Sequence, residues 1–327
     1  MTKSIKSRAL KTAVGLLLAG TVTANAQDVV IWGGFPELAG YYERVAESLS
    51  GKYPDLNVIV EPIGLRDHEK RVALGLSSGL DDATVLELIG STANRYIVND
   101  LIQPAPGGVS AFVNDSSNFE TFFQETATVN GSVYGVPVFR GQGALFYNTD
   151  MLAAAGLEGP PTTMDEYDEY AAKLTQRDAD GNPTVSGWSL RLSGGGGGIA
   201  EKFWINLHQY GGTLLEQEGD NYRAGYANEM GLAALKQYVN AVSGLKTVTV
   251  EMPADSAAFQ REQTAMFIRE SWVIGDTAKK APDLNYKTAV LPRGSIALPV
   301  NLYVSGGSEE AQAAAWDFAI AANEPEH

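Results

Sequence analysis

The sequence contains no cysteine, and this absence excludes several kinds of chemistry at once. Without thiols the chain has no disulfide framework, no zinc site built on thiolates, no cysteine nucleophile and no lipid-modified N-terminal cysteine. Histidine is also rare, with three residues, and the sequence contains no Walker A, dinucleotide-binding or HExxH motif. We therefore expect no bound metal ion and no cofactor.

Basic side chains are scarce as well. The sequence has 24 Lys and Arg against 39 Asp and Glu, which gives a formal net charge of -15. Because such a surface repels phosphates on average, nucleic acid is not expected as a partner. Hydrophobic residues make up 44% and charged residues 19%, a balance typical of globular proteins. The length of 327 residues corresponds to about two domains of roughly 150 residues each.

The first 26 residues resemble an export signal. They contain four basic and no acidic side chains, an apolar run over residues 13–22 and the triplet Ala24-Asn25-Ala26. The apolar run is about half as long as the ~20 residues that span a membrane, which favours a cleaved signal peptide over an anchor. Cleavage before Gln27 removes four positive charges, so the charge of -15 becomes -19 in the mature chain. No later segment is apolar enough to cross a bilayer, so we expect a soluble, exported protein without a lipid anchor.

Strands and helices alternate after the cleavage site. Short apolar runs are typical of strands buried on both faces, and apolar residues at helical spacing separate them. The predicted order is strand, helix, strand, helix, strand over residues 28–32, 37–50, 56–61, 66–77 and 84–89. This order predicts parallel strands in an open α/β sheet, whose ligands bind at the carboxyl ends of the strands. Those ends lie at residues 32–37, 62–67 and 90–94.

Two extended segments, residues 133–148 and 298–304, are expected to cross between two lobes. The remaining pattern predicts helices near residues 165–177, 199–209, 229–242, 255–262 and 309–322, and strands around Trp188 and over 265–268 and 286–291. The glycine tract at residues 194–198 is the one low-complexity segment, and it predicts a flexible loop.

Three patterns associated with catalysis or metal binding occur in an unsuitable context. Residues 75–79 match the G-x-S-x-G hydrolase motif, but a helix precedes the serine and a strand follows, which reverses the required order. The oxygen-rich run 178–182 has its glycine one position too early for an EF-hand loop, which favours a solvated turn. A glycosidase needs two carboxylates facing each other across a sugar bond. Nothing in the sequence pairs Glu37, Asp67 or Glu87 with a carboxylate in the second lobe.

Aromatic and planar polar side chains are more informative, because they occur near the predicted strand ends and crossing segments. A sugar binds to flat apolar surfaces through its C–H groups and to planar polar groups through its hydroxyls. Trp188 and Trp204 are as well explained by a place in the core, and Trp32 by a place under the sheet. Trp272, which directly follows a predicted strand in a loop, is the best single candidate. The full set is Trp32, Phe35, Arg140, Gln142, Trp188, Arg191, Trp204, Trp272 and Asn301.

Three stretches of the chain also resemble a known family. Residues 134–162 are similar to its "YGVP … LFYN-D … AGL-PP-T" pattern, residues 259–272 to "F--G-AAM-I-G-W", and residues 286–318 to "Y-V-PLP … A-A-W-F". In this order, after a signal peptide, they resemble the family 1 extracellular solute-binding proteins. This group contains maltose-binding protein and many sugar-capturing components of ABC importers.

Two departures from the family pattern affect these expectations. Arg261 and the pair Arg269-Glu270 replace the usual glycines, which predicts a different shape for the loop that carries Trp272. Family members usually continue with further helices after the position of His327, so the resemblance implies that the C-terminal part is truncated.

The resemblance implies a periplasmic-binding-protein-like α/β fold of type II, with two lobes joined by crossing hinge strands. The N-terminal lobe would comprise residues 27–138 and 304–327, and the C-terminal lobe residues 139–303. With Arg191 added from the aromatic and polar set, the expected ligand-binding residues are Phe35, Glu37, Arg66, Asp67, Ser91, Arg140, Gln142, Arg191, Trp272 and Asn301.

We therefore expect a monomeric periplasmic binding protein that captures a sugar by hinge closure and delivers it to inner-membrane ABC permease subunits, without catalysis. Two alternatives stay open. The same fold could bind a polyamine, iron or a phosphorylated solute, although Arg140 and Arg191 argue against a cation. A secreted glycosidase would instead convert an oligosaccharide to products.

Overall fold

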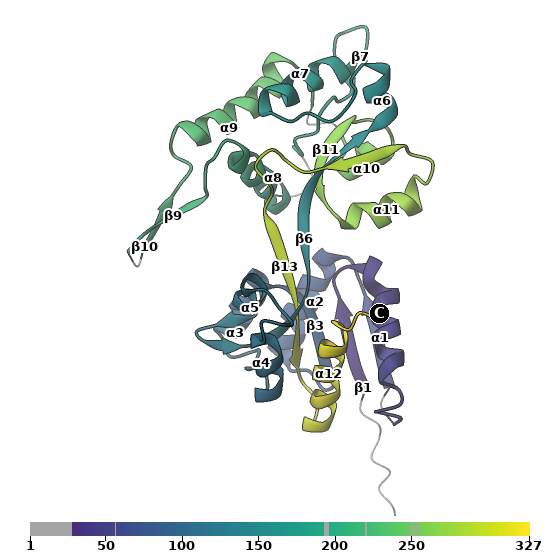
Figure 1. Cartoon of the computed structure of the whole chain (residues 1–327), viewed down its shortest axis with the longest axis vertical. Helices are drawn as coiled ribbons and strands as arrows, with labels where there is room; N and C mark the ends of the chain where they lie inside the picture. The colour runs from purple at the N-terminus through teal and green to yellow at the C-terminus, as the bar shows by residue number, and fades with distance from the viewer. Residues whose placement is uncertain (1–27, 56, 193–195, 220, 250–251, 254) are drawn as a thin grey trace, which may run out of the picture.

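A computed structural model describes residues 28–327, apart from 56, 193–195, 220, 250–251 and 254. The elements form two bodies, one above the other in Figure 1, joined by the long strands β6 (Gly135–Asn148) and β13 (Ala297–Ser305). The predicted signal peptide lies outside the described residues. Among the helices of the described chain, none is long and apolar enough to cross a membrane.

The N-terminal body is built on the predicted βαβαβ unit. Its strands β1 (Asp28–Gly33), β2 (Asn57–Pro62) and β3 (Ala83–Ile89) are parallel, with β1 in the middle. The helices between them are α1 (Ala39–Leu49) and α2 (Leu65–Ser78), so the predicted order and its parallel pairing are confirmed. A 3-10 turn, η1 (Pro36–Leu38), precedes α1. The serines of the G-x-S-x-G match occupy the end of α2 and donate to backbone carbonyls one turn earlier.

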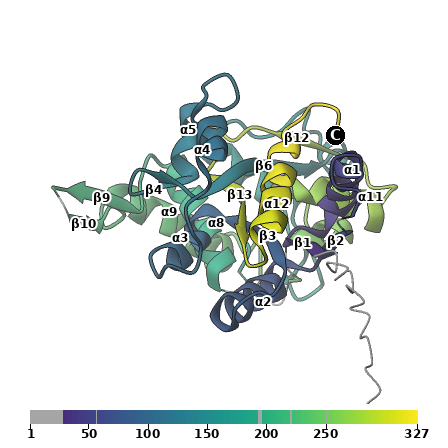
Figure 2. The same ribbon diagram turned by 90° about the horizontal axis from the view of Figure 1, so that it is seen from below.

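Helices cover both faces of this sheet, because successive side chains of a strand point to opposite faces. Val29 and Ile31 of β1 pack with α1, α4 (Gly107–Asn114) and the last helix, α12 (Glu309–Ala321). On the opposite face, Trp32 packs with α2 and α3 (Gly90–Ile97). Figure 2 shows α1 and α12 on one side of the strands and α2 on the other. A short helix, α5 (Thr121–Thr126), leads to the hairpin of β4 (Thr128–Val129) and β5 (Ser132–Val133).

The second body surrounds the outer half of β6. There β6 pairs with β11 (Met266–Glu270) and β12 (Tyr286–Ala289), both antiparallel. Its helices are α6 (Thr149–Ala154), α7 (Met164–Leu174), α8 (Gly196–Gln209), α9 (Glu229–Val239), α10 (Asp255–Gln260) and α11 (Trp272–Lys280). A π-helical turn, η2 (Asn240–Gly244), extends α9.

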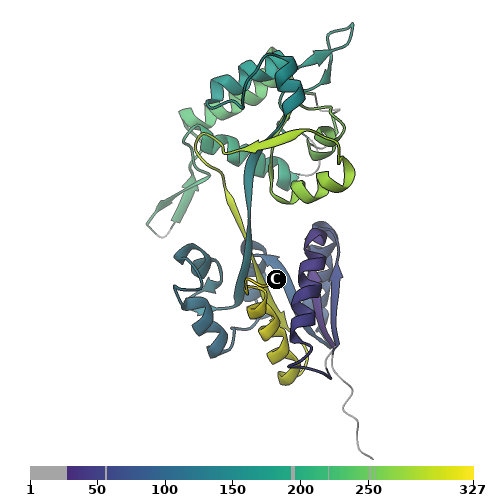
Figure 3. The ribbon, with the colours of Figure 1, turned by 45° about the vertical axis from the view of Figure 1, so that its right-hand side comes forward.

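The crossing strands connect two separate hydrophobic cores. Val136 of β6 packs in the core of the N-terminal body, whereas Leu145, nine positions later, packs in that of the second body. Figure 3 shows β6 and β13 as the extended connection between the bodies. Both crossing segments were predicted from the sequence, and both are confirmed. Their pairing contains a register shift at Val300 and Asn301, close to where the strands leave the N-terminal body.

Three local predictions in the second body are wrong. Trp188 lies outside the named strands, between two isolated bridges at Ser186 and Ser189. Gly196 begins α8, so the later part of the glycine tract is helical, whereas residues 193–195 lie outside the described residues. Trp272 begins a helix rather than lying in a loop, because the chain turns into α11 directly after β11. The second body also contains two antiparallel strand pairs. One joins β7 (Gln176–Arg177) and β8 (Pro183–Val185), and the other joins β9 (Leu215–Glu218) and β10 (Asn221–Ala224).

Candidate ligand-binding site

The carboxyl ends of the parallel strands are directed toward the second body. Ile89, at the end of β3, pairs with Val300, whereas Thr84 pairs with Ser305 at the far end of β13. Because β13 descends from the second body, the end of β3 is the nearer one, and β1 and β2 run parallel to it (Figure 1). The sheet therefore presents its strand ends where the sequence predicts a ligand site.

Several predicted ligand residues follow these strand ends. Phe35 follows β1, Arg66 and Asp67 lie in the first turn of α2, and Ser91 is the second residue of α3. Arg66 pairs with Glu69 at 3.1 Å and Asp67 pairs with Lys70 at 2.9 Å. Arg66, Asp67 and Ser91 are exposed, so their polar groups lie at the surface of this edge.

Glu87 holds the loop after β1, a role that the sequence did not indicate. Its side chain is 0% exposed, and its carboxylate accepts hydrogen bonds from the backbone N–H groups of Gly34 at 2.6 Å and Phe35 at 3.1 Å. The hydroxyl of Tyr42 donates to its other oxygen at 2.5 Å. Burial raises the pKa of Glu87 to about 7, against the opposing effect of these donors. Glu87 therefore positions the loop after β1, and the negative charge of Glu37 adds to the rise in its pKa.

His68 supports the same strand from α2. Its side chain is fully buried, and its Nε2 lies 2.7 Å from the backbone carbonyl of Glu87. Since a carbonyl only accepts, Nε2 carries the proton of a neutral imidazole. Burial lowers the pKa of His68 to about 4.

The crossing strands carry two exposed candidates and one buried one. Arg140 and Gln142 of β6 are exposed, and the Arg140 guanidinium lies 5.8 Å from the ring of Phe123. Next to Arg140, the ring of Phe139 meets that of Phe35 edge-on at 5.2 Å, which brings the β1 loop against the crossing strand. Asn301 of β13 is 0% exposed. Its amide donates to the backbone carbonyl of Thr126 and to the hydroxyl of Tyr303, inside the N-terminal body.

Glu37 and Trp272 lie on elements that meet between the two bodies. The turn η1, which contains Glu37, contacts α11, which begins at Trp272. Burial raises the pKa of Glu37, as does the negative charge of Asp276 on α11, whereas Lys279 lowers it. The Trp272 ring is partly buried against Phe146 and its neighbours. Phe35, Glu37, Arg140 and Trp272 are thereby brought to the junction of the bodies.

Behind Trp272 the second body contains a cluster of paired charges. The ammonium of Lys202 contacts the carboxylates of Glu270 and Glu201. Arg269 Nε lies 3.6 Å from a Glu270 oxygen and 3.9 Å from an Asp255 oxygen. The cavity beside Lys202 and Asp255 has a volume of about 10 Å³, room for at most one water. Charges of opposite sign thus neutralise each other here without space for a ligand.

Arg191 lies at the edge of this cluster rather than beside Trp272. Its backbone adopts a left-handed conformation with φ 49°, and its positive charge lowers the pKa of Asp255, although burial raises that pKa more. The guanidinium packs against Gly198, where an added Cβ would lie 2.4 Å away. The glycine at this point of α8 therefore has a packing reason, which the sequence alone did not reveal.

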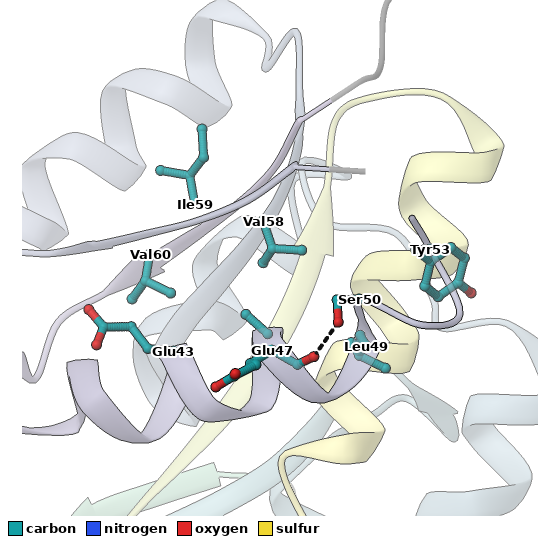
Figure 4. Close-up of a pocket in the computed structure, with 9 residues that line it drawn as sticks. Glu43, Glu47, Leu49, Ser50, Tyr53, Val58, Ile59 and Val60 are labelled. Carbon is teal, nitrogen blue, oxygen red and sulfur yellow. Dashed lines mark hydrogen bonds between the residues drawn. The ribbon is translucent and has the colours of Figure 1, made fainter. Parts of the chain in front are cut away.

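A larger hollow on the described chain lies elsewhere. A groove of about 510 Å³ lies between α1 and β2 and is lined by none of the predicted ligand residues. In Figure 4, Val58 and Val60 point toward α1, whereas Ile59 points to the other side of the strand. Glu43 and Glu47 of α1 border the groove. It is a surface feature of an edge strand, remote from the junction of the two bodies.

Two α/β bodies joined by crossing strands define a periplasmic-binding-protein fold. A family model for bacterial extracellular solute-binding proteins matches residues 45–327, and the chain belongs to this family. The matching model is family 8, whereas the sequence resemblance pointed to family 1; the broader assignment is confirmed. The family is one of solute-binding proteins rather than enzymes.

Relatives with known names or structures share the fold at low identity. The lactose-binding protein of Rhizobium radiobacter is 26% identical over 300 residues, which cover 87% of this chain and 66% of that protein. The GacH receptor of Streptomyces glaucescens GLA.O, solved unliganded and with acarbose, has a TM-score of 0.74 at 20% identity over 92% of this chain and 76% of its own. UgpB from Mycobacterium tuberculosis, in complex with glycerophosphocholine, has a TM-score of 0.74 at 17% identity over 92% and 75%. The chain spans 66% of the length of this lactose-binding protein and of three binding proteins from Brucella that it also matches.

Proposed function

We propose that this protein captures an uncharged sugar or oligosaccharide between its two bodies. The proposal treats residues 27–138 with 304–327, and residues 139–303, as lobes that close over the ligand. The observation that carries it is the junction itself, where Trp272 of one body and the Phe35 loop of the other lie at the crossing strands. An aromatic face with nearby planar polar groups suits a sugar ring and its hydroxyls.

The charge pattern supports a neutral ligand. Lys202 and Arg269 are already paired with carboxylates of the second body, so neither positive charge needs a charged ligand as its partner. The lactose-binding relative and the acarbose-bound neighbour agree with this choice of substrate class.

Hinge movement is supported by the crossing strands. Residues 139–143 of β6 include two glycines, and opposite them Pro299 lacks a backbone N–H, which weakens the ladder. We propose that ligand shifts the population toward a closed form, which inner-membrane ABC permease subunits recognise in the periplasm. The protein would act there as an exported monomer.

A phosphorylated solute is the second candidate. The exposed guanidinium of Arg140 on the crossing strand is suited to a phosphate, and the neighbour bound to glycerophosphocholine has the same fold.

Isothermal titration calorimetry against lactose, maltose, maltotriose, glycerophosphocholine, putrescine and ferric citrate tests the proposal. We expect saturable binding of a sugar without product formation, and Trp272→Ala should weaken it by about 1–3 kcal/mol. Tyr222→Ala, at an exposed ring on the distant β9–β10 hairpin, is the matched control and should leave affinity unchanged. Binding of glycerophosphocholine alone would support the second candidate, and sugar hydrolysis or preference for putrescine or iron would refute the proposal.

A further inference from the structure

The Trp272 ring is held by the two residues that end β11. Its indole N–H donates to the Glu270 carboxylate, with Nε1 and Oε2 3.2 Å apart. The Arg269 guanidinium lies over the ring, 4.8 Å from its centroid. One edge and one face of the indole are therefore occupied by charged groups of its own chain, which restricts the orientation of the ring.

Glu270 is itself fixed in place. Its side chain is nearly buried and its second carboxylate oxygen accepts from Lys202. Burial by itself would raise the pKa of Glu270, but the charge of Lys202 and the hydrogen bonds that Glu270 makes together lower the pKa, so the carboxylate stays ionised. Glu270 also lies against the crossing strand β6, because a Cβ on Gly141 would be 3.7 Å from its Cγ. A carboxylate with so many neighbours is a rigid acceptor.

We propose that Glu270 and Arg269 are positioning residues that set the orientation of the Trp272 ring toward a ligand. The proposal rests on the function proposed above and deepens it, since it names what makes Trp272 a ready stacking surface. A ring that is already held in one orientation loses less rotamer freedom when a ligand binds. Loss of Glu270 or Arg269 should therefore lower the affinity for the ligand.

The charged side chains of this cluster are poorly placed to contact a ligand directly. The nearby cavity of about 10 Å³ admits at most one water, and Glu270, Arg269 and Lys202 each expose less than a tenth of their surface. The two positions are also those where this chain departs from the glycines of the family pattern, so the arrangement belongs to this sequence.

A double-mutant cycle on ligand affinity tests whether Glu270 acts through Trp272. With the best sugar of the panel, Glu270→Ala should weaken binding about tenfold, in line with the loss of a charge-assisted hydrogen bond. Glu270→Gln, which keeps an oxygen acceptor, should weaken it less than about threefold. In the Trp272→Ala background, Glu270→Ala should cause no further loss, because the ring that it positions is gone.

Glu201→Gln is the matched control. Glu201 accepts a hydrogen bond from the same Lys202 ammonium at 3.0 Å, whereas the indole of Trp272 donates to Glu270. We expect this variant to bind sugar like the wild type. If Glu201→Gln weakens binding as much as Glu270→Ala, the cluster acts through general integrity of the fold and the proposal is overturned. Additive losses from Glu270→Ala and Trp272→Ala would overturn it as well.

A second measurement does not need a sugar. In the ¹⁵N-labelled protein, the indole N–H signal of Trp272 is assigned by its loss in Trp272→Phe. Glu270→Ala should move that signal upfield and speed its exchange with solvent, Glu270→Gln should do so less, and Glu201→Gln should leave it in place. An unchanged signal in a folded Glu270→Ala variant refutes the positioning role. If no sugar binds but the signal responds as expected, the proposed function fails while the positioning of the ring stands.

Discussion

The buried carboxylate of Glu87 makes a specific prediction about pH and stability. The folded chain holds its pKa at about 7, compared with 4.5 for a free glutamate. Such a group takes up its proton more readily in the folded chain. Stability linked to that proton is therefore fully present below pH 4.5 and is lost as the pH rises through 7.

The size of the effect follows from the difference in pKa. Since one pKa unit corresponds to about 1.4 kcal/mol, protonation of Glu87 contributes about 3 kcal/mol between pH 8 and pH 4.5. In Glu87→Gln this contribution is absent, whereas the amide oxygen still accepts from the loop N–H groups that Glu87 binds. The free energy of unfolding of the wild type, minus that of the variant, should therefore rise by about 3 kcal/mol as the pH falls over this range.

Equilibrium unfolding in urea, followed by tryptophan fluorescence at several pH values between 8 and 4.5, measures this difference. The titration of His68 is common to both proteins and cancels. Glu43→Gln, on the exposed face of α1, makes the same change of charge and should leave the difference flat within about 0.5 kcal/mol. A flat difference for Glu87→Gln as well would refute the reasoning, as would a slope of opposite sign.

Three further predictions concern the N-terminal body and the crossing strands. The pKa of His68 is lowered to about 4, so the wild type should lose stability relative to His68→Gln as the pH falls from 6.5 to 4, in the same urea experiment. A Cβ on Gly135 would lie 2.9 Å from the ring of Tyr303, so Gly135→Ala should cost about 1–3 kcal/mol, whereas Gly141→Ala should change the thermal midpoint little. Asn301→Leu removes the amide that donates to the buried Tyr303 hydroxyl and to the partly buried carbonyl of Thr126, and should lower the free energy of unfolding by about 2 kcal/mol, measured by urea denaturation.

The strand and helix pattern of the N-terminal body was predictable because it depends on residues that are close together in the sequence. Runs of apolar residues predicted β1, β2 and β3, and helical spacing predicted α1 and α2, each within a few residues of its observed bounds. Parallel pairing followed from the order of strands and helices. Predictions failed where the local pattern is weak, as at Trp188, which is buried between two isolated bridges without a strand of its own.

The sequence by itself determined the alternation of strands and helices, the two crossing segments and the broader class of extracellular solute-binding proteins, since each is carried by residues close together along the chain. Only the tertiary structure decided that Glu87 lies under the loop of Gly34, 53 positions away, and that Lys202 meets Glu270, 68 positions away. The first contact arises because β1 and β3 are neighbouring parallel strands, and the second because the fold places α8 beside the end of β11. Burial then raises the pKa of Glu87, and the periodicity of the sequence does not show that this carboxylate is buried.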